Sequence, residues 1–271
     1  MSGNSAEFIG DIPTHYDDHG LGPVLFVDFA DRLTNACCDG TPMNVIELAA
    51  GTGIVSRKLR DQLPPEASLL VTDLNPPMLE VAKGKFADGE NVDFEVANAM
   101  ELSFGDAEFD LMVCQFGVMF FPDKPAAFRE ASRVLRPGGR YVFNVFSAMQ
   151  ENPYSQVAYG IPAQFFPGEP QGFYKVPFHY GNPEKVREDL KAAGWQDVTH
   201  EAIQLKKRLV NPEGFARGLV YGNPLIDEIR NRGGVDPETV TAAVLRALNV
   251  TFGPTDMTMP LEATMFTCTA P

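Results

Sequence analysis

Between Met43 and Phe146, short apolar runs alternate with segments of helical periodicity. The apolar runs predict five strands, at residues 44–48, 68–73, 92–96, 109–114 and 140–146. The fourth run is continuously apolar, which is typical of a strand buried on both faces of a parallel sheet. The periodic segments predict helices at residues 53–62, 76–85 and 124–135, and Arg136-Pro-Gly-Gly139 predicts a turn. We therefore expect an α/β fold with a Rossmann-like, doubly wound and mostly parallel sheet.

The second half of the chain has fewer clear elements. Residues 183–193 predict a helix that ends at Gly194, and residues 197–205 and 261–269 predict two strands. Because a long, mostly helical insertion separates these strands at the end of the chain, we expect an antiparallel hairpin at one sheet edge. Near the N-terminus, residues 24–36 predict an amphipathic helix.

These elements predict one domain with five parts. The parts are an N-terminal cap at 1–40, a ligand-binding core at 41–147, a lid segment at 148–182, the end of the sheet at 183–210 and 258–271, and a helical insertion at 211–257. The cap, the lid segment and the insertion lie outside the alternating pattern, and we expect them to close over one end of the sheet. The lid segment has weak periodicity and is expected to be irregular, as lids and binding loops often are.

The charge balance excludes some partners. Lys and Arg number 22 against 36 Asp and Glu, which gives a formal charge of −14. A nucleic acid or an anionic membrane surface is disfavoured, because such partners are usually met by a basic face. The N-terminus lacks a signal-peptide pattern, and the most apolar stretch, 111–121, is too short to span a bilayer. We expect a cytoplasmic protein with reduced thiols (Cys37, Cys38, Cys114 and Cys268) and no metal, because the cysteine spacing does not suit zinc.

The main chemical signal is a strand followed by a glycine turn and a helix start. Gly51-Thr-Gly53-Ile-Val-Ser56 lets the backbone approach a ligand closely, and a helix start offers free N–H groups. This segment nearly matches the dinucleotide fingerprint, and Asp73 lies about where a ribose-binding acid belongs. An ordinary tight turn without a ligand is the other interpretation. The glycine turn alone therefore favours a nucleoside at the carboxyl end of the sheet without choosing the ligand.

Five motifs in order separate the candidate ligands. They are Glu47-x-Ala49-x-Gly51-x-Gly53, Asp73-Leu74-Asn75-Pro-Pro-Met78-Leu, Asn98-Ala99-Met100, Phe109-Asp110 through Phe121-Pro-Asp123, and Arg133-Val-Leu-Arg-Pro-Gly-Gly139. With these motifs the chain resembles class I S-adenosylmethionine (SAM)-dependent methyltransferases, in particular the small-molecule group with the ubiquinone and menaquinone methyltransferases. The resemblance covers residues 44–146 well and 183–197 loosely. Alanine stands at position 49 where that family usually has its first glycine.

The resemblance implies roles for individual residues. Asp73 would bind both ribose hydroxyls, although an aspartate here could also cap a helix. Asn98 stands where an Asp normally reads the adenine amine; its amide can still accept and donate, although Asn is also a common turn residue. Glu47 would act on the methionine amino group, directly or through water. From their position at the exit of the fourth strand, Gln115, Phe116 and Met119 are expected to line the sulfonium end. Tyr16 in the N-terminal segment could fold over the sulfonium or the acceptor, although an aromatic residue in a lid more often packs than binds.

The implied site has no metal and uses SAM, with S-adenosylhomocysteine (SAH) as the product. Its expected cofactor-binding residues are Glu47, Ala49, Gly51, Thr52, Gly53, Asp73, Leu74, Met78, Asn98, Ala99, Met100, Gln115, Phe116 and Tyr16. Methyl transfer is an in-line displacement, so orientation and exclusion of water supply much of the rate and a general base is optional. If a base exists, His179 with Tyr180 is the first choice and His15 the second; solvated loop histidines are the alternative. The remaining histidines are His19 and His200, the latter expected to be structural.

The acceptor is less defined than the cofactor. Aromatic residues of the lid segment favour a partly apolar or aromatic small molecule that accepts through O, N or C. Lys206-Lys207-Arg208 and Arg217 could instead read an acidic group or form a solvated basic face. Two other functions stay open: a nicotinamide-dependent oxidoreductase that uses Gly51, Gly53 and Asp73, and a SAM-binding partner subunit without catalysis. An obvious Tyr-x-x-x-Lys pair for hydride transfer is lacking.

Overall fold

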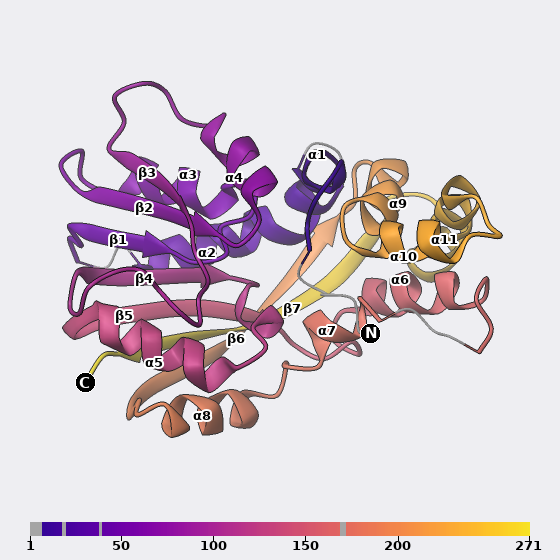
Figure 1. Ribbon diagram of the computed structural model, residues 1–271. Coiled ribbons are helices and arrows are strands. Elements are labelled where there is room, and N and C mark those ends of the chain that lie inside the picture. Colours follow the sequence, from indigo (N-terminus) through magenta and orange to yellow (C-terminus); the bar gives the residue numbers. More distant parts are fainter. Residues whose placement is uncertain (1–6, 18–19, 38–39, 169–171) are drawn as a thin grey trace.

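A seven-stranded sheet crosses the molecule in the order β3-β2-β1-β4-β5-β7-β6 (Figure 1). The structure, a computed structural model, describes residues 7–17, 20–37, 40–168 and 172–271. Strands β1 to β5 are parallel, and β7 pairs antiparallel with both β5 and β6. The strands are β1 Asn44–Glu47, β2 Ser68–Asp73, β3 Val92–Val96, β4 Phe109–Gln115, β5 Leu135–Phe146, β6 Asp197–Arg208 and β7 Thr258–Thr269. The predicted fold class, with its terminal antiparallel hairpin, is confirmed.

Helices cover both faces of the sheet. Successive side chains of a strand point to opposite faces, and on β5 the Arg140 guanidinium donates to carbonyls of α2 while the Tyr141 ring packs near Phe128 of α5. Helices α2 and α5 therefore lie on opposite faces, and α8 packs beside α5. The helices are α1 Ile12–Asp17, α2 Val27–Cys37, α3 Ile54–Gln62, α4 Pro76–Lys83, α5 Lys124–Val134, α6 Pro153–Ala163, α7 Lys175–Phe178, α8 Pro183–Ala192, α9 Pro212–Tyr221, α10 Leu225–Arg232 and α11 Pro237–Phe252, with a π-helical turn Gly22–Phe26 and a 3-10 turn Val118–Phe120.

Two local expectations are wrong. Strand β5 begins at Leu135 instead of Arg140, and the predicted turn forms an irregularity inside it: Phe109 and Leu111 of β4 pair with Leu135 and Arg140. The positive φ of Gly138, 79°, accommodates this excursion. The lid segment is not irregular either, because it contains α6 and α7. Helix α6 packs against both α11 and β7, so apolar residues lie around much of its circumference. Its sequence therefore lacks the single apolar stripe from which an amphipathic helix is predicted.

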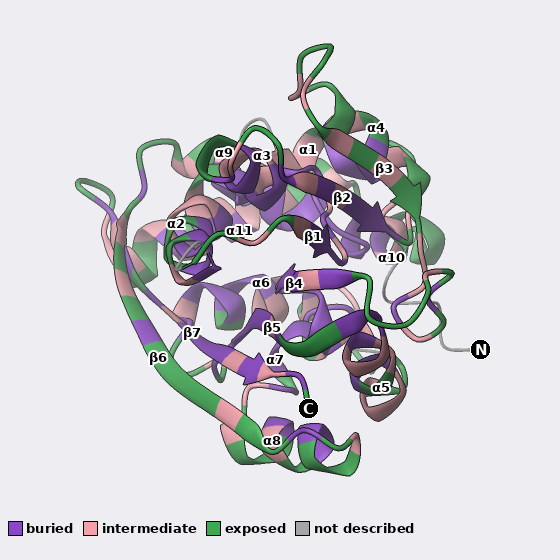
Figure 2. Cartoon of the chain, turned by 90° about the vertical axis from the view of Figure 1, so that its left-hand side faces the viewer, coloured by how far each residue is buried: buried purple, intermediate pink, exposed green. Residues whose placement is uncertain are grey.

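The cap, lid and insertion gather at one end of the sheet, as Figure 1 shows for α1, α6, α7, α9, α10 and α11. This is the end where the parallel strands finish. Phe116, directly after β4, stacks on Phe146 at the end of β5 with 3.9 Å between ring centroids, and Phe146 stacks on Phe178 of α7 at 5.2 Å. Figure 2 shows buried strands in the middle of the sheet and exposed residues along the edge strands β3 and β6. Among the described residues, no helix has the length and apolar character needed to cross a membrane.

Candidate functional site

Three adjoining cavities lie at the carboxyl ends of the parallel strands. The polar cavity, about 230 Å³, is lined by residues of the glycine turn, the end of β2 and the segment 97–100. The aromatic cavity, about 60 Å³, is lined by residues of the cap, the ends of β4 and β5, α6, α7 and α9. The small cavity, about 30 Å³, lies behind the glycine turn and includes Glu47 and Thr52. Tyr16 lines all three cavities.

The glycine turn is held in a left-handed backbone conformation. Gly51 and Gly53 have φ of 57° and 80°, and a Cβ on Gly53 would lie 2.9 Å from the Cβ of Ala82 on α4. Glycine at position 53 therefore lets α3 start in close contact with α4. Ala49 has φ of 51°, a conformation that glycine adopts without strain. The alanine thus occupies a backbone position that explains why a glycine is usual there.

Asp73, buried at the end of β2, connects the glycine turn to the start of α4. Its Oδ2 accepts from the Gly51 backbone N–H at 2.8 Å, and its Oδ1 accepts from the Asn75 backbone N–H at 2.8 Å and side chain at 3.1 Å. Asn75, not Asp73, is the N-cap residue of α4, so the capping alternative is wrong. Burial raises the pKa of Asp73, while these hydrogen bonds oppose that rise. Asp73 lines the polar cavity, and its three hydrogen bonds leave one lone-pair position of the carboxylate free.

Glu47, at the end of β1, is the second buried carboxyl of the site. Ser56 donates to its Oε2 at 2.5 Å, whereas Oε1 has no hydrogen-bond partner among the described residues. Burial raises the pKa of Glu47 to about 8, and the nearby Asp73 adds to the rise. A buried carboxyl with an unpartnered oxygen fits a cationic ligand group in the small cavity.

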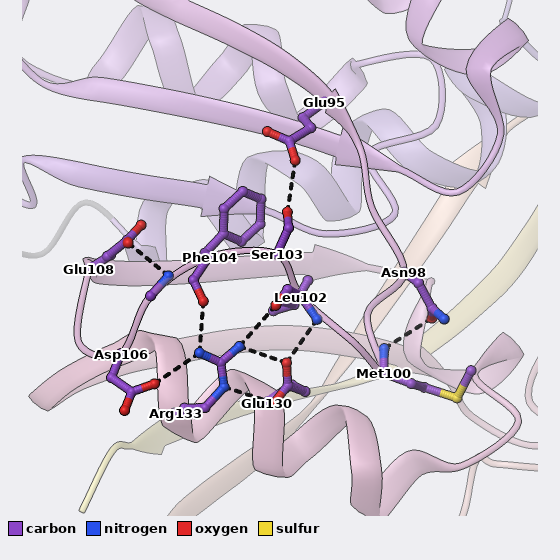
Figure 3. Close-up of polar contacts among 11 residues, drawn as sticks. Glu95, Asn98, Met100, Leu102, Ser103, Phe104, Asp106, Glu108, Glu130 and Arg133 are labelled. Atoms are coloured by element: carbon purple, nitrogen blue, oxygen red, sulfur yellow. Dashed lines mark hydrogen bonds and ion pairs between the residues drawn. The ribbon is translucent and has the colours of Figure 1, made fainter.

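Asn98 lies on the wall of the polar cavity in a tight turn. Its Oδ1 accepts from the Met100 backbone N–H at 3.1 Å (Figure 3), so both the turn role and a position beside the ligand apply. One lone pair of Oδ1 is used by the turn, and the NH₂ group has no partner among the described residues. The side chain can therefore still donate and accept toward a base edge.

The segment after Asn98 is fixed by Arg133 and Glu130 of α5, a role that the sequence did not reveal. Arg133 donates to the carbonyls of Phe104 at 2.7 Å and Leu102 at 3.0 Å, and Glu130 accepts from the Leu102 backbone N–H at 2.8 Å (Figure 3). The Arg133 guanidinium holds the pKa of Glu130 below its ordinary value. Arg133 belonged to a recognised motif, but its partners are about 30 residues away in the chain.

Asn144 of β5, also missed by sequence reasoning, supports the exit of β4. Its buried side chain accepts from the Phe116 backbone N–H at 3.0 Å and donates to Gln115 at 3.4 Å. Phe116 has φ of 53°, so this hydrogen bond holds a strained backbone conformation. Gln115 and Phe116 thereby face the polar cavity, and Gln115 also reaches the small cavity.

The N-terminal segment covers the site. The Tyr16 ring stacks on Phe26 at 4.9 Å, and Phe8 donates its backbone N–H to Asn75 Oδ1 at 3.1 Å. Asp17 binds the glycine turn and the segment after α4, since it accepts from Thr52 at 3.2 Å and from Lys85 at 2.5 Å. Tyr16 is therefore positioned over the junction of the cavities.

The structure brings together all but one of the expected cofactor-binding residues. Gly53 lines none of the cavities and acts through the backbone. The polar cavity includes Ala49, Gly51, Asp73, Leu74, Met78, Asn98, Ala99, Met100, Gln115, Phe116 and Tyr16. Met119 lines the aromatic cavity instead. The roles of these residues in binding stay a prediction.

The candidate bases do not reach the cavities. His179 is exposed with Nδ1 at 2.5 Å from the Val176 carbonyl, and Tyr180 donates to Asp189 at 2.9 Å. His15 packs beside the Tyr221 ring and faces Asp11. None of the three is among the residues that line the described cavities, so none is retained as a base. His200 lies exposed on the edge strand, and His19 is outside the described residues.

The basic residues considered for an acidic acceptor are ion-paired elsewhere. Lys207 pairs with Asp28 at 2.8 Å, Arg208 with Asp256 at 2.7 Å and Arg217 with Glu238 at 2.7 Å. Lys206 does not line the cavities either. Within the described part of the chain, no three His, Cys, Asp or Glu side chains cluster as metal ligands do.

The fold and the strand-end cavities define a Rossmann-like methyltransferase architecture. A solved phosphoethanolamine N-methyltransferase 2 from Haemonchus contortus, in complex with phosphomonomethylethanolamine and SAH, aligns with a TM-score of 0.60 at 14% identity, over 96% of this chain and 57% of that one. The [4+2]-cyclase SpnF aligns with a TM-score of 0.56 at 17% identity, over 90% and 80%. At these identities the likeness shows the fold alone, and SpnF illustrates that this fold serves different reactions.

Sequence comparison identifies the family. The model of the ubiE/COQ5 methyltransferase family matches residues 26–168, and the chain belongs to this family. The ubiquinone/menaquinone biosynthesis C-methyltransferase UbiE of Hahella chejuensis is 37% identical over 121 residues, 44% of this chain and 48% of that protein. The chain thus spans about half the length of the curated relatives it matches.

Proposed function

We propose that this protein transfers a methyl group from SAM to a partly apolar or aromatic small molecule. The observation that carries this proposal is the junction at Tyr16 of a polar cavity with the buried carboxyl of Asp73, a small cavity with that of Glu47, and an aromatic cavity. Membership of the ubiE/COQ5 family supports methyl transfer. UbiE and the phosphoethanolamine enzyme have names that point to different acceptors, so neither identifies the acceptor here.

SAM would supply a methyl group bound to a cationic sulfur. In this proposal Asp73 accepts from the ribose, Asn98 reads the adenine edge and Glu47 meets the ammonium group; the support is that Asp73 and Asn98 line the polar cavity and Glu47 the small one. The ring faces of Tyr16 and Phe26 offer cation–π attraction of about 0.5–2 kcal/mol to the sulfur. The residues of this chain thereby bind and orient the donor, and the covering segment excludes water.

The aromatic cavity favours catalysis by orientation. No Asp, Glu, His, Lys or Arg side chain is among its described lining residues, so a general base is not part of the proposal. Its volume of about 60 Å³ is smaller than the roughly 150 Å³ of a known cavity that holds benzene. Binding of an aromatic acceptor therefore requires one wall to move. We propose that the moving wall is the N-terminal segment that covers the site. Its residue Phe8 contacts the cavity wall through edge-to-face contacts with Phe120 and Phe173.

Isothermal titration calorimetry with SAM and SAH tests the proposal directly. We expect both ligands to bind the purified protein and extracts incubated with isotopically labelled SAM to yield one labelled small molecule by mass spectrometry. Absence of binding by both ligands would contradict the proposal. Binding of NADH that SAM does not displace would favour the oxidoreductase alternative, and SAM binding without any labelled product would favour a non-catalytic partner subunit.

A further inference from the structure

Tyr154 of α6 is a buried tyrosine whose hydroxyl has no hydrogen-bond partner among the described residues. Its side chain is 2% exposed and lines the aromatic cavity. Tyrosine hydroxyls in buried surroundings usually find a partner, and the hydroxyl of Tyr154 is not among the fully enclosed unpaired atoms, so it borders the space of the cavity. This hydroxyl therefore requires an explanation.

Other buried tyrosines of the same region have partners. Tyr174, which lines the same cavity, donates to the Leu219 carbonyl at 2.7 Å and accepts from Asn223 at 3.1 Å. Tyr180, in the same lid segment, donates to Asp189 at 2.9 Å. The surrounding helices can thus satisfy a tyrosine hydroxyl, and they leave that of Tyr154 unsatisfied.

The ring of Tyr154 is held firmly by its neighbours. It contacts the Phe178 ring edge-on at 6.2 Å and the Phe215 ring at 5.8 Å. Burial raises the pKa of Tyr154 well above its ordinary value, so the hydroxyl stays a proton-bearing donor at neutral pH. Because no charged side chain lines the described cavity, a charged ligand group would be left without a counter-charge.

We propose that the Tyr154 hydroxyl hydrogen-bonds an uncharged oxygen, a hydroxyl or a carbonyl, of the methyl acceptor. This inference rests on the proposed function and makes Tyr154 a specificity-determining residue. Acceptors with such an oxygen gain the hydrogen bond, whereas hydrocarbons of the same shape leave the hydroxyl unpaired. A site built around a hydrogen bond rejects analogues that lack it more strongly than an apolar wall rejects a change of size.

Phenol and toluene form a matched pair of probes, since they differ by a hydroxyl in place of a methyl group. Both are titrated into the SAH-loaded protein by calorimetry. We expect the wild-type protein to bind phenol about tenfold more tightly than toluene. Tyr154→Phe should reduce this preference to within about threefold, with unchanged SAH affinity and an unchanged or higher melting temperature, because Tyr154 lines neither the polar nor the small cavity.

Tyr174→Phe is the control variant in the same cavity. It loses the bonds to Leu219 and Asn223, so we expect a lower melting temperature with the phenol preference retained. A phenol preference that persists in Tyr154→Phe, that disappears equally in Tyr174→Phe, or that is absent from the wild-type protein would overturn the inference. Failure of SAH to bind would instead contradict the proposed function, and the comparison of phenol with toluene on the ligand-free protein would still test Tyr154.

Discussion

The polar cavity and the aromatic cavity share Tyr16 but are built from different parts of the chain. Apart from Phe8 and Tyr16, the polar cavity takes its walls from residues 48–122, at the ends of neighbouring parallel strands. The aromatic cavity takes its walls from residues 8–26, 116–178 and 219–223. The polar cavity therefore depends on short strand-to-helix connections. The aromatic cavity depends on the packing of segments that lie about 200 residues apart in the chain.

This difference limits what family membership implies. The family match at residues 26–168 contains most of the polar cavity, whereas α1, α7 and α9, which contribute to the aromatic cavity, lie outside it. Membership is therefore stronger support for a shared donor site than for a shared acceptor. Four substitutions test whether the two cavities have the separate roles that this comparison assigns.

Asp73→Ala should have the largest effect on the polar cavity. A charge-assisted hydrogen bond from a ribose hydroxyl to the remaining lone pair of Asp73 contributes about 1.5–3 kcal/mol, so SAM affinity measured by calorimetry should fall about 10- to 150-fold. Asp110→Ala is the matched control, because Asp110 also accepts two backbone N–H groups, from Met43 and Asn44, but lines no described cavity. Equal losses of affinity in both variants would contradict the ribose role.

Glu47→Gln tests the buried carboxyl through pH dependence. Glu47 has a pKa of about 8 in the folded protein and an ordinary pKa of 4.5 in the unfolded chain. Between pH 4.5 and 8 the folded protein therefore keeps a proton on Glu47 that the unfolded chain has released. The contribution of this raised pKa to the unfolding free energy is therefore fully present below pH 4.5 and is lost as the pH rises to 8. Between these limits the unfolding free energy falls by about 1.4 kcal/mol per pH unit. Urea unfolding of the ligand-free protein at several pH values should show this fall reduced in Glu47→Gln. The exposed Glu80→Gln should keep the wild-type slope, and identical slopes in all three proteins would count against the buried proton.

Tyr16→Ala tests the junction of the cavities. Loss of the ring should remove about 0.5–2 kcal/mol of cation–π attraction and weaken SAM binding about 3- to 30-fold. Tyr16→Phe keeps the stack on Phe26 and should bind SAM within about threefold of wild type. If both variants bind SAM as the wild-type protein does, Tyr16 belongs to the aromatic cavity alone.

Ala49→Gly should have the smallest effect. Relief of the left-handed conformation at φ 51° outweighs the extra freedom of glycine in the unfolded chain, so the unfolding free energy should rise by up to about 1 kcal/mol. Ala50→Gly is the neighbouring control; its φ is not positive, and it should lower that free energy by about 0.5–1 kcal/mol. A decrease in Ala49→Gly would show that its methyl group, which faces Gly117, contributes more through packing than it costs in strain.

Elements with a strong local signal were predictable. Strands β2 and β3 begin and end where the alternating and apolar runs predict. Helix α6 was missed because it is buried on several sides and has no clean amphipathic stripe. The candidate bases from the lid, His179 and Tyr180, do not line the three cavities, because residue type does not reveal which way a side chain faces.

The sequence by itself determined the sheet, the glycine turn and the carboxyls Glu47 and Asp73, because parallel strands bring the residues at their carboxyl ends to one edge. Only the tertiary structure decided that Arg133 fixes the segment after Asn98, that Asn144 supports Phe116 and that Tyr154 faces an aromatic cavity without a partner. These contacts join residues that local periodicity does not relate. The geometry of these contacts depends on how α5 and α6 pack on the sheet that contains β5, which is a property of the whole fold.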